Sequence, residues 1–249
     1  MTPRTDHRLG LAVRVGAPLT ALLALASLWA DWFYAPQDTV QGPAQRIFYV
    51  HVPLAWTAFL AFGVVCVASV AYLVTRRGGW DLLARCAAEV GVVLCTAVLA
   101  TGMLWGKPVW GTWWTWDARL TSTLVLWLIY VAYVMLRGMV EDRERAARYA
   151  AVLGIVGALD IPFIHFAVLW WRTLHPQPVV VRADGPALPP TMLATLMLGL
   201  ITMTAVFVTL LLLRIRVERA AERLEDAAEG APALTPIHPQ LERPLWTAS

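Results

Sequence analysis

The chain has 249 residues, of which 59% are hydrophobic and only 15% are charged. Soluble domains carry about 25% charged residues, so this composition excludes an ordinary water-soluble globule. The formal net charge is +3, and we expect no nucleic acid among the partners. The three cysteines, Cys66, Cys86 and Cys95, lie in apolar segments without CxxC spacing, which disfavours thiol–disulfide chemistry. No GxxxxGK(S/T) motif for phosphate binding is present, so we expect no ATP hydrolysis by this chain.

Six apolar stretches are long enough to cross a bilayer core, which takes about 20 helical residues. They cover approximately residues 11–34, 53–75, 86–105, 120–136, 149–169 and 191–213. Continuous apolar runs lack the alternation of a barrel strand, so we predict an all-α integral membrane protein with six transmembrane helices. The first run follows Arg4, Arg8 and Arg14 as in a signal peptide, but it is longer than an h-region of about 7–15 residues and is expected to be retained.

The basic residues alternate between the two sides of these spans. Fifteen lie in the N-terminus, the 76–85 turn, the 137–148 connector and the tail, and only five lie in the connectors 35–52, 106–119 and 170–190. Because cytoplasmic loops are enriched in Lys and Arg, both termini are predicted to be cytoplasmic. We divide the chain into a six-helix membrane domain, residues 1–215, and a cytoplasmic tail, residues 216–249, which we expect to be partly helical and then disordered.

Tryptophan is concentrated between the third and fourth spans. The stretch WGKPVWGTWWTWDARLTS, Trp105 to Ser122, holds five of the thirteen Trp residues together with Gly106, Pro108 and Gly111. Glycine and proline at this density argue against a regular helix, so we predict a Trp-rich outer loop. Indoles on a loop offer flat faces with one N–H donor each, which suits a flat, aromatic ligand. The alternative is an aromatic belt at the membrane boundary, which usually takes fewer Trp residues.

Two histidines lie on other connectors of the same side. His51 is in the segment RIFYVHVP, where Pro53 is expected to begin the second helix and to leave His51 at the outer boundary. His175 follows the fifth span in WWRTLH. Neutral imidazole suits iron, so the pair is predicted to hold a heme iron from both faces while the Trp loop packs a porphyrin edge. Alternatively, each is an interfacial side chain hydrogen-bonded to its neighbours.

Four cations, Arg46, Lys107, Arg119 and Arg172, lie close to these elements. They stand on the side that carries few basic residues, and the planar fork of Arg suits the carboxylates of heme propionates. Ordinary contact with lipid headgroups is the alternative. Asp117 is predicted to orient the loop through an indole N–H or through Arg119 rather than to act directly.

Asp160 and His165 lie inside the fifth span, in LDIPFIHF, where ionisable residues are costly and tend to be functional. His165 precedes His175 by ten residues, about 15 Å along a continuous helix, so it is too deep to bind the same iron. We interpret His165 as an interior side chain with satisfied hydrogen bonds. The alternative is that it lines a path by which the ligand enters. Pro162 is expected to kink this helix.

Together these motifs resemble a known family. WGTWWTWDARLTS, Trp110 to Ser122, resembles the tryptophan-rich WWD signature of heme-handling proteins, a superfamily that includes the larger cytochrome c heme lyases. RIFYVHVP and HFAVLWWRTLH are similar to the segments around the two axial histidines of the cytochrome c maturation protein C (heme exporter protein C) family. The resemblance covers approximately residues 10–215, whereas Asp160 and the Pro-containing tail do not match the family pattern.

The resemblance implies that His51 and His175 are axial ligands of a non-covalent heme b. It also implies heme contacts by Trp113, Trp114, Trp116 and Asp117, to which the arguments above add Trp110, Arg119, Arg46 and Arg172. The implied partners are the ABC-type ATPase and the membrane subunit of a heme export complex, a small single-span membrane protein and a periplasmic heme chaperone, with membrane lipid around the spans. The implied location is the bacterial inner membrane, with the heme site on the periplasmic side.

We therefore predict a component of cytochrome c-type biogenesis that holds heme at the periplasmic face and delivers it to the chaperone, and that is not a turnover enzyme. The alternative is a membrane-bound heme redox subunit passing electrons to or from quinone, although such subunits usually pair histidines within the bilayer. A third class, a small-molecule permease, predicts polar or broken helices near the midplane of more than one span. Only Asp160–Pro162, and Glu89, are candidates for such a site.

Overall fold

The computed structural model describes residues 3–171, 173–176, 179–180 and 182–229, and in this part every regular element is a helix. The helices are α1 (Pro3–Trp29) with a π-helical turn η1 (Ala30–Tyr34), a 3-10 helix η2 (Pro43–Ile47), α2 (Phe48–Thr75), α3 (Gly78–Trp110), α4 (Ala118–Met139), α5 (Arg143–Ala158), α6 (Asp160–Trp170) and α7 (Pro190–Glu229). Six helical segments of the described part are long and apolar enough to cross a membrane, and α5 and α6 together form one of them. The predicted all-α fold with six membrane spans is confirmed.

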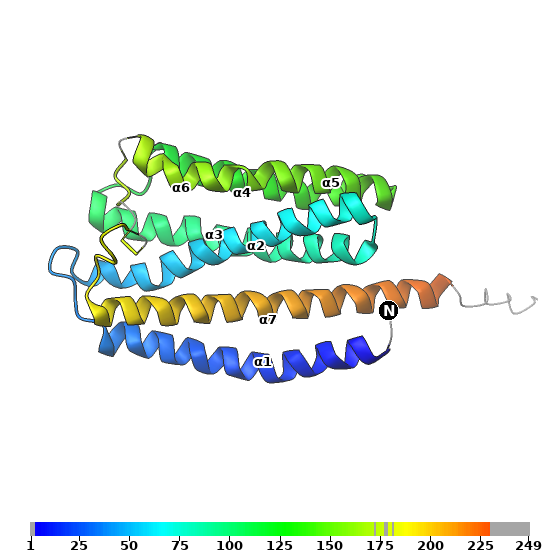
Figure 1. The fold of residues 1–249 in the computed structure, drawn as a ribbon, viewed down its shortest axis with the longest axis horizontal. Helices are drawn as coiled ribbons and strands as arrows, with labels where there is room; N and C mark the ends of the chain where they lie inside the picture. Colours follow the sequence, from blue (N-terminus) through cyan, green and yellow to red (C-terminus); the bar gives the residue numbers. More distant parts are fainter. Residues whose placement is uncertain (1–2, 172, 177–178, 181, 230–249) are drawn as a thin grey trace, which may run out of the picture.

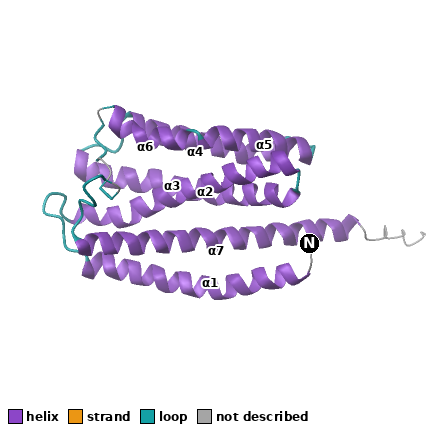
Figure 2. Cartoon of the chain, viewed as in Figure 1, coloured by secondary structure: helices purple, strands orange, loops and turns teal. Residues whose placement is uncertain are grey.

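The helices lie side by side, and their connectors gather at the two ends of the bundle (Figures 1 and 2). We call the end that carries the 111–117 loop and the connector between α6 and α7 the aromatic end. The N-terminus and the α2–α3 turn lie at the opposite end (Figure 1). The helix α2 packs chiefly against α3, α5 and α7, while α1 packs mainly against α7. Much of α1 is therefore left for lipid.

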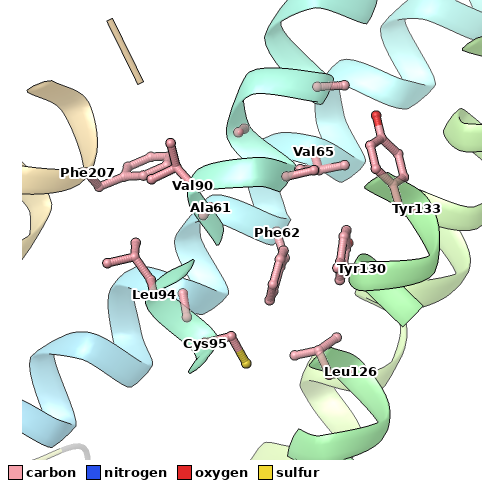
Figure 3. Close-up of a cluster of buried hydrophobic side chains, with 14 of the residues drawn as sticks. Ala61, Phe62, Val65, Val90, Leu94, Cys95, Leu126, Tyr130, Tyr133 and Phe207 are labelled. Carbon is pink, nitrogen blue, oxygen red and sulfur yellow. The ribbon is translucent and has the colours of Figure 1, made fainter. Parts of the chain in front are cut away.

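The core forms where α2, α3 and α4 meet, with Phe207 of α7 beside them (Figure 3), and it also includes Ala150 of α5. Phe62 stacks on Tyr130 with ring centroids 3.8 Å apart, and the Tyr130 hydroxyl donates to the Gly154 carbonyl at 2.8 Å. A Cβ on Gly91 would lie 2.6 Å from Phe62 Cε1, and one on Gly154 would lie 2.9 Å from Val65 Cγ1. Small residues thus let these helices approach closely, which is how membrane helices associate where lipid offers no hydrophobic driving force.

Ion pairs connect α3 with α4 and α7 within the bundle. Arg137 on α4 donates twice to Asp81 on α3, at 2.7 and 2.6 Å. Arg214 on α7 donates to both carboxylate oxygens of Glu89 on α3 and to Glu218 at 2.6 Å. Glu89 therefore has a structural partner, as ionisable groups in membrane helices usually do.

The helix α3 extends through the first third of the stretch that was expected to be a loop. The prediction that glycine and proline exclude a helix there is wrong up to Trp110. Gly106 is needed for packing, since a Cβ would lie 3.1 Å from Trp110 Cε3. Pro108 lies in the last helical turn, where it removes the N–H that would bond the Leu104 carbonyl. Gly111, with φ +76°, ends the helix, so the loop comprises only residues 111–117.

Pro53 does not begin the second helix as predicted. The helix α2 begins at Phe48 and contains Pro53, so His51 lies in its first turn and not on a connector. Proline at this position removes only the N–H that would bond the Tyr49 carbonyl. The helix α7 packs at the same place, since a Cβ on Gly199 would lie 2.9 Å from the Tyr49 oxygen.

The fifth span is interrupted where it was predicted to be continuous with a kink. A turn at Leu159 separates α5 from α6, and Pro162 lies in the first turn of α6, where proline is tolerated. The side chain of His165 is exposed on α6, so its assignment to the interior is wrong. The helix α7 runs unbroken across the predicted domain boundary at 215/216, and the tail beyond Glu229 lies outside the described residues.

Candidate functional site

A cavity of about 240 Å³ opens at the aromatic end. Its walls come from α2, from the last turns of α3, from the start of α4 and from the connector after α6. They are mostly apolar, and their polar or aromatic members are Gln41, His51, Phe59, Trp105, Trp110, Trp114, Arg119, Thr123 and His175. Pockets with apolar walls and a few convergent polar groups are typical of small-molecule and cofactor sites.

His51 reaches this cavity from the first turn of α2 and is only 9% exposed. Its Nδ1 lies 2.9 Å from the hydroxyl oxygen of Thr101 on α3. Its ring meets that of Trp105 edge to face, with centroids 5.7 Å apart. A Cβ on Gly102 would lie 3.2 Å from His51 Cε1. The imidazole is therefore held on three sides by one face of α3.

His175 reaches the same cavity from the connector after α6. Its Nδ1 lies 3.2 Å from the Pro176 carbonyl oxygen, which can only accept, so the ring proton belongs on Nδ1 and Nε2 is left bare. Burial, followed by the nearby positive charge of Arg119, lowers the pKa of His175 from its ordinary 6.5 to about 3. At neutral pH the ring is uncharged, which is the form that binds metals.

The tryptophans of the predicted loop divide into two groups. Trp110 and Trp114 line the cavity, as does Trp105 on α3. The Nε1–H of Trp114 is buried and has no hydrogen-bond partner in the described part of the chain. Trp113 and Trp116, in contrast, are 54% and 77% exposed and do not line the cavity. The structure thus brings together only part of the predicted aromatic set.

The predicted cations also separate. Arg119 lines the cavity, and its guanidinium has no hydrogen bond or ion pair with any other described residue. Arg46 faces elsewhere: it lies 3.6 Å from Asp31 and over the Trp32 ring, 5.5 Å from the ring centroid. Lys107 donates to the Gly111 carbonyl at 3.0 Å and does not line the cavity. Arg172 lies outside the described residues.

Asp117 has a structural function at the start of α4. One of its oxygens accepts from the backbone N–H groups of Arg119 and Leu120, both at 3.0 Å, which is an N-cap. Its other oxygen accepts from the Thr115 hydroxyl at 2.9 Å. The expected orienting role agrees with this geometry, although the bonds go to backbone N–H groups and a hydroxyl instead of an indole. They fix the end of the loop next to Arg119.

Some cavity residues were not singled out as site residues from the sequence. Trp105 donates from Nε1 to Gln41 Oε1 at 3.0 Å, which links the connector after α1 to α3. Thr101 lies one helical turn before Trp105 on the same face of α3, and it contacts His51 without lining the cavity itself. That contact depends on how α2 and α3 pack, which the sequence does not show. For Gln41 the sequence offers no signal. His165 and Asp160 do not line the cavity.

Fold and cavity define a multi-pass membrane protein with a histidine- and tryptophan-lined ligand cavity at one end of its bundle. The family described as heme exporter protein C matches residues 4–229, so the chain belongs to the heme exporter protein C family. Heme exporter protein C of Bradyrhizobium diazoefficiens is 44% identical over 210 residues, which cover 84% of this chain and 80% of the relative. The Haemophilus influenzae protein of the same name is 36% identical over 88% of this chain and 90% of its own length, and the Escherichia coli K12 protein is 38% identical over 69% and 74%.

Proposed function

We propose that this chain carries heme in cytochrome c maturation: it holds heme b non-covalently at the periplasmic face of the bacterial inner membrane and delivers it to a periplasmic heme chaperone. The observation that carries the proposal is that His51, in the first turn of α2, and His175, on the connector after α6, line one cavity. The name of the relatives, heme exporter protein C, agrees with heme as the cargo.

The residues present suit heme. Two neutral imidazoles supply nitrogen ligands for the iron, and the apolar walls suit the porphyrin. The guanidinium of Arg119 lines the cavity near the charge of Asp117 and makes no hydrogen bond or ion pair within the described residues, so it is available for a propionate carboxylate. The unpartnered N–H of Trp114 is a further donor in the same wall. A buried N–H donor without an acceptor costs free energy, and a ligand that accepts its hydrogen bond would remove that cost.

The size of the cavity fits a cargo that is passed on. Pockets that enclose a drug-sized ligand measure about 300–1,000 Å³, so a cavity of about 240 Å³ covers only part of a heme. An edge of the ring then stays accessible to the chaperone. Delivery requires that the bonds from the iron to His51 and His175 are replaced, and the chain itself undergoes no net chemical change. For this reason we propose cofactor transfer and not enzymatic turnover.

The orientation rests on the distribution of charge. The N-terminus and the α2–α3 turn lie at the end opposite to the cavity (Figure 1) and carry Arg8, Arg76 and Arg77, which favours a cytoplasmic position for that end. Since the sequence has no phosphate-binding motif, an ABC-type ATPase with its membrane subunit would supply the energy. A small single-span protein and the chaperone complete the proposed assembly.

The redox-subunit alternative is less well supported. It expects both histidines on facing helices within the bilayer, whereas His175 lies on a connector.

Heme content tests the proposal. We expect the purified wild type to contain a low-spin heme by the pyridine hemochrome assay, and the His51→Ala, His175→Ala double variant to lose it. His7→Ala, at the opposite end of α1, is the control and should keep the wild-type yield. In parallel, chaperone loading should fall only in the double variant. Unchanged heme content in the double variant would refute the proposed ligands, and intact heme with no transfer would favour the redox subunit.

A further inference from the structure

Thr101 contacts three polar atoms with one hydroxyl group. Its oxygen lies 2.7 Å from the Ala97 carbonyl oxygen and 3.2 Å from the Val98 carbonyl oxygen, both in the preceding turn of α3. It also lies 2.9 Å from Nδ1 of His51 on α2. A hydroxyl has one proton to donate and two lone pairs to accept with.

These distances determine which atom carries the shared proton. Carbonyl oxygens only accept, so the Thr101 proton points back toward Ala97 and Val98, as is common for threonine in helices. The bond to His51 must then run the other way, with Nδ1–H as the donor and the Thr101 oxygen as the acceptor. A neutral imidazole with its proton on Nδ1 has a bare Nε2.

We propose that Thr101 is the positioning residue for heme binding by His51: it fixes the ring orientation and the Nδ1–H tautomer, so that the Nε2 lone pair is available to the iron. This inference rests on the proposed function. The partner of the second nitrogen is what orients a metal-binding histidine and sets its basicity. Pro176 does the same for His175 through its carbonyl oxygen, so both rings have Nε2 unprotonated.

The two acceptors, the Thr101 hydroxyl and the Pro176 carbonyl, are uncharged, and this affects how firmly the histidines would hold the iron. A carboxylate at Nδ1 would make the imidazole a stronger donor to the metal, whereas a hydroxyl or a carbonyl raises its basicity less. The described neighbours of His51 Nδ1 and His175 Nδ1 are a hydroxyl and a carbonyl. Iron–nitrogen bonds of moderate strength suit a heme that must be handed on.

What separates Thr101 from other threonines is its contact with a histidine. Several threonines in the spans bond only to a carbonyl of the preceding turn, among them Thr57, Thr195 and Thr204. Thr204 matches Thr101 best as a control, because it is also half-buried and donates to the Leu200 carbonyl at 2.7 Å, but it lies on α7 and makes no hydrogen bond to a histidine within the described part of the chain.

The test compares full-length Thr101→Val, Thr101→Ser and Thr204→Val proteins in detergent or nanodiscs, with hemin as the probe. We expect Thr101→Val to bind hemin about 10–100-fold more weakly, the range typical when a metal-binding histidine loses its hydrogen-bond partner. Thr101→Ser and Thr204→Val should resemble the wild type. The electron paramagnetic resonance spectrum of the residual low-spin heme should shift in Thr101→Val alone, because the orientation of the His51 ring changes.

A second measurement needs no heme. Nitrogen-15 spectra of histidine-labelled apo protein, with the His51 signal assigned by comparison with His51→Ala, should show Nδ1–H and a bare Nε2 in the wild type and in Thr101→Ser. A wild-type His51 protonated on Nε2 would overturn the proposal, even if Thr101→Val failed to fold. So would equal weakening by Thr101→Val and Thr101→Ser, which would indicate packing by the shared atoms and not the hydroxyl. If His51→Ala binds hemin as the wild type does, it is the proposed function that fails.

Discussion

Trp114 and Trp116 lie two positions apart in one loop with ring centroids 5.7 Å apart and planes at 76°, yet only Trp114 lines the cavity. The edge-to-face contact holds one indole inside while the other is 77% exposed. A loop can place near neighbours in such different surroundings because it lacks the fixed periodicity of a helix.

This pair yields a comparison of two similar substitutions. Trp114→Phe keeps an aromatic ring but removes the buried, unpartnered N–H, whereas Trp116→Phe removes an exposed one. We expect Trp114→Phe to weaken hemin binding roughly two- to tenfold, the equivalent of one hydrogen bond, and Trp116→Phe to weaken it less. Hemin titration followed by absorbance measures both. The reverse order would indicate that heme lies on the outer side of the loop.

Arg119 is predicted to bind a propionate. Arg119→Gln should weaken hemin binding about tenfold or more, since hydrogen bonds to charged groups contribute about 1.5–3 kcal/mol. The matched control is Arg182→Gln, which changes an exposed arginine of the connector between α6 and α7. Titration with hemin and with its dimethyl ester separates the effects, because the ester lacks the carboxylate charge. Equal loss of affinity for both compounds would contradict a propionate contact.

The position of His175 on a connector predicts chemical rescue. His175→Gly should lose the bis-imidazole absorption spectrum, and added imidazole should restore it, since the missing side chain leaves space beside Trp110, whose ring centroid lies 6.2 Å from that of His175. The control is His165→Gly, which removes an exposed histidine of α6 outside the cavity. Loss of the low-spin spectrum in the control as well would show that His175 has no special role.

Packing of the bundle core predicts a stability difference between two glycines. Gly91→Ala would bring a Cβ to 2.6 Å from Phe62 Cε1, whereas nothing lies within 4 Å of a Cβ at Gly63. Because overpacking a tight core costs about 1–3 kcal/mol, Gly91→Ala should lower the Tm and Gly63→Ala should not. Thermal unfolding of both variants in one detergent checks this. A Gly91→Ala protein as stable as Gly63→Ala would show that the Phe62 ring can move away from α3 without loss of stability.

The sequence could predict the spans because a hydrophobic run of sufficient length has one stable form in a bilayer. It also predicted that His51 and His175 lie at the same end, since the alternation of charged connectors assigns them to one side. Their role as ligands stays a prediction. The surroundings of Arg46 could not be foreseen, because its partner Asp31 lies on the π-helical turn after α1 and the pairing depends on how α1 ends. The division of the tryptophans could not be foreseen either, since a loop has no periodicity to read.

The N-caps of α4 and α5 provide a matched pair for testing how the Trp loop is held. Asp117 and Asp142 each accept from the backbone N–H groups two and three positions further along the chain, Asp117 at the aromatic end and Asp142 at the opposite end. Asp117→Ala should destabilise the start of α4 by about 0.5–2 kcal/mol and displace Arg119, so hemin binding should weaken. Asp117→Asn should restore most of the affinity, because asparagine caps helices equally well.

Asp142→Ala removes the same type of cap without touching the cavity, so it should leave hemin binding at the wild-type level. Hemin titration and thermal unfolding of the three variants distinguish a cap from a direct heme contact. Affinity that falls in Asp117→Asn as far as in Asp117→Ala would mean that the charge of Asp117, and not its hydrogen bonds to the start of α4, is what the bound heme requires.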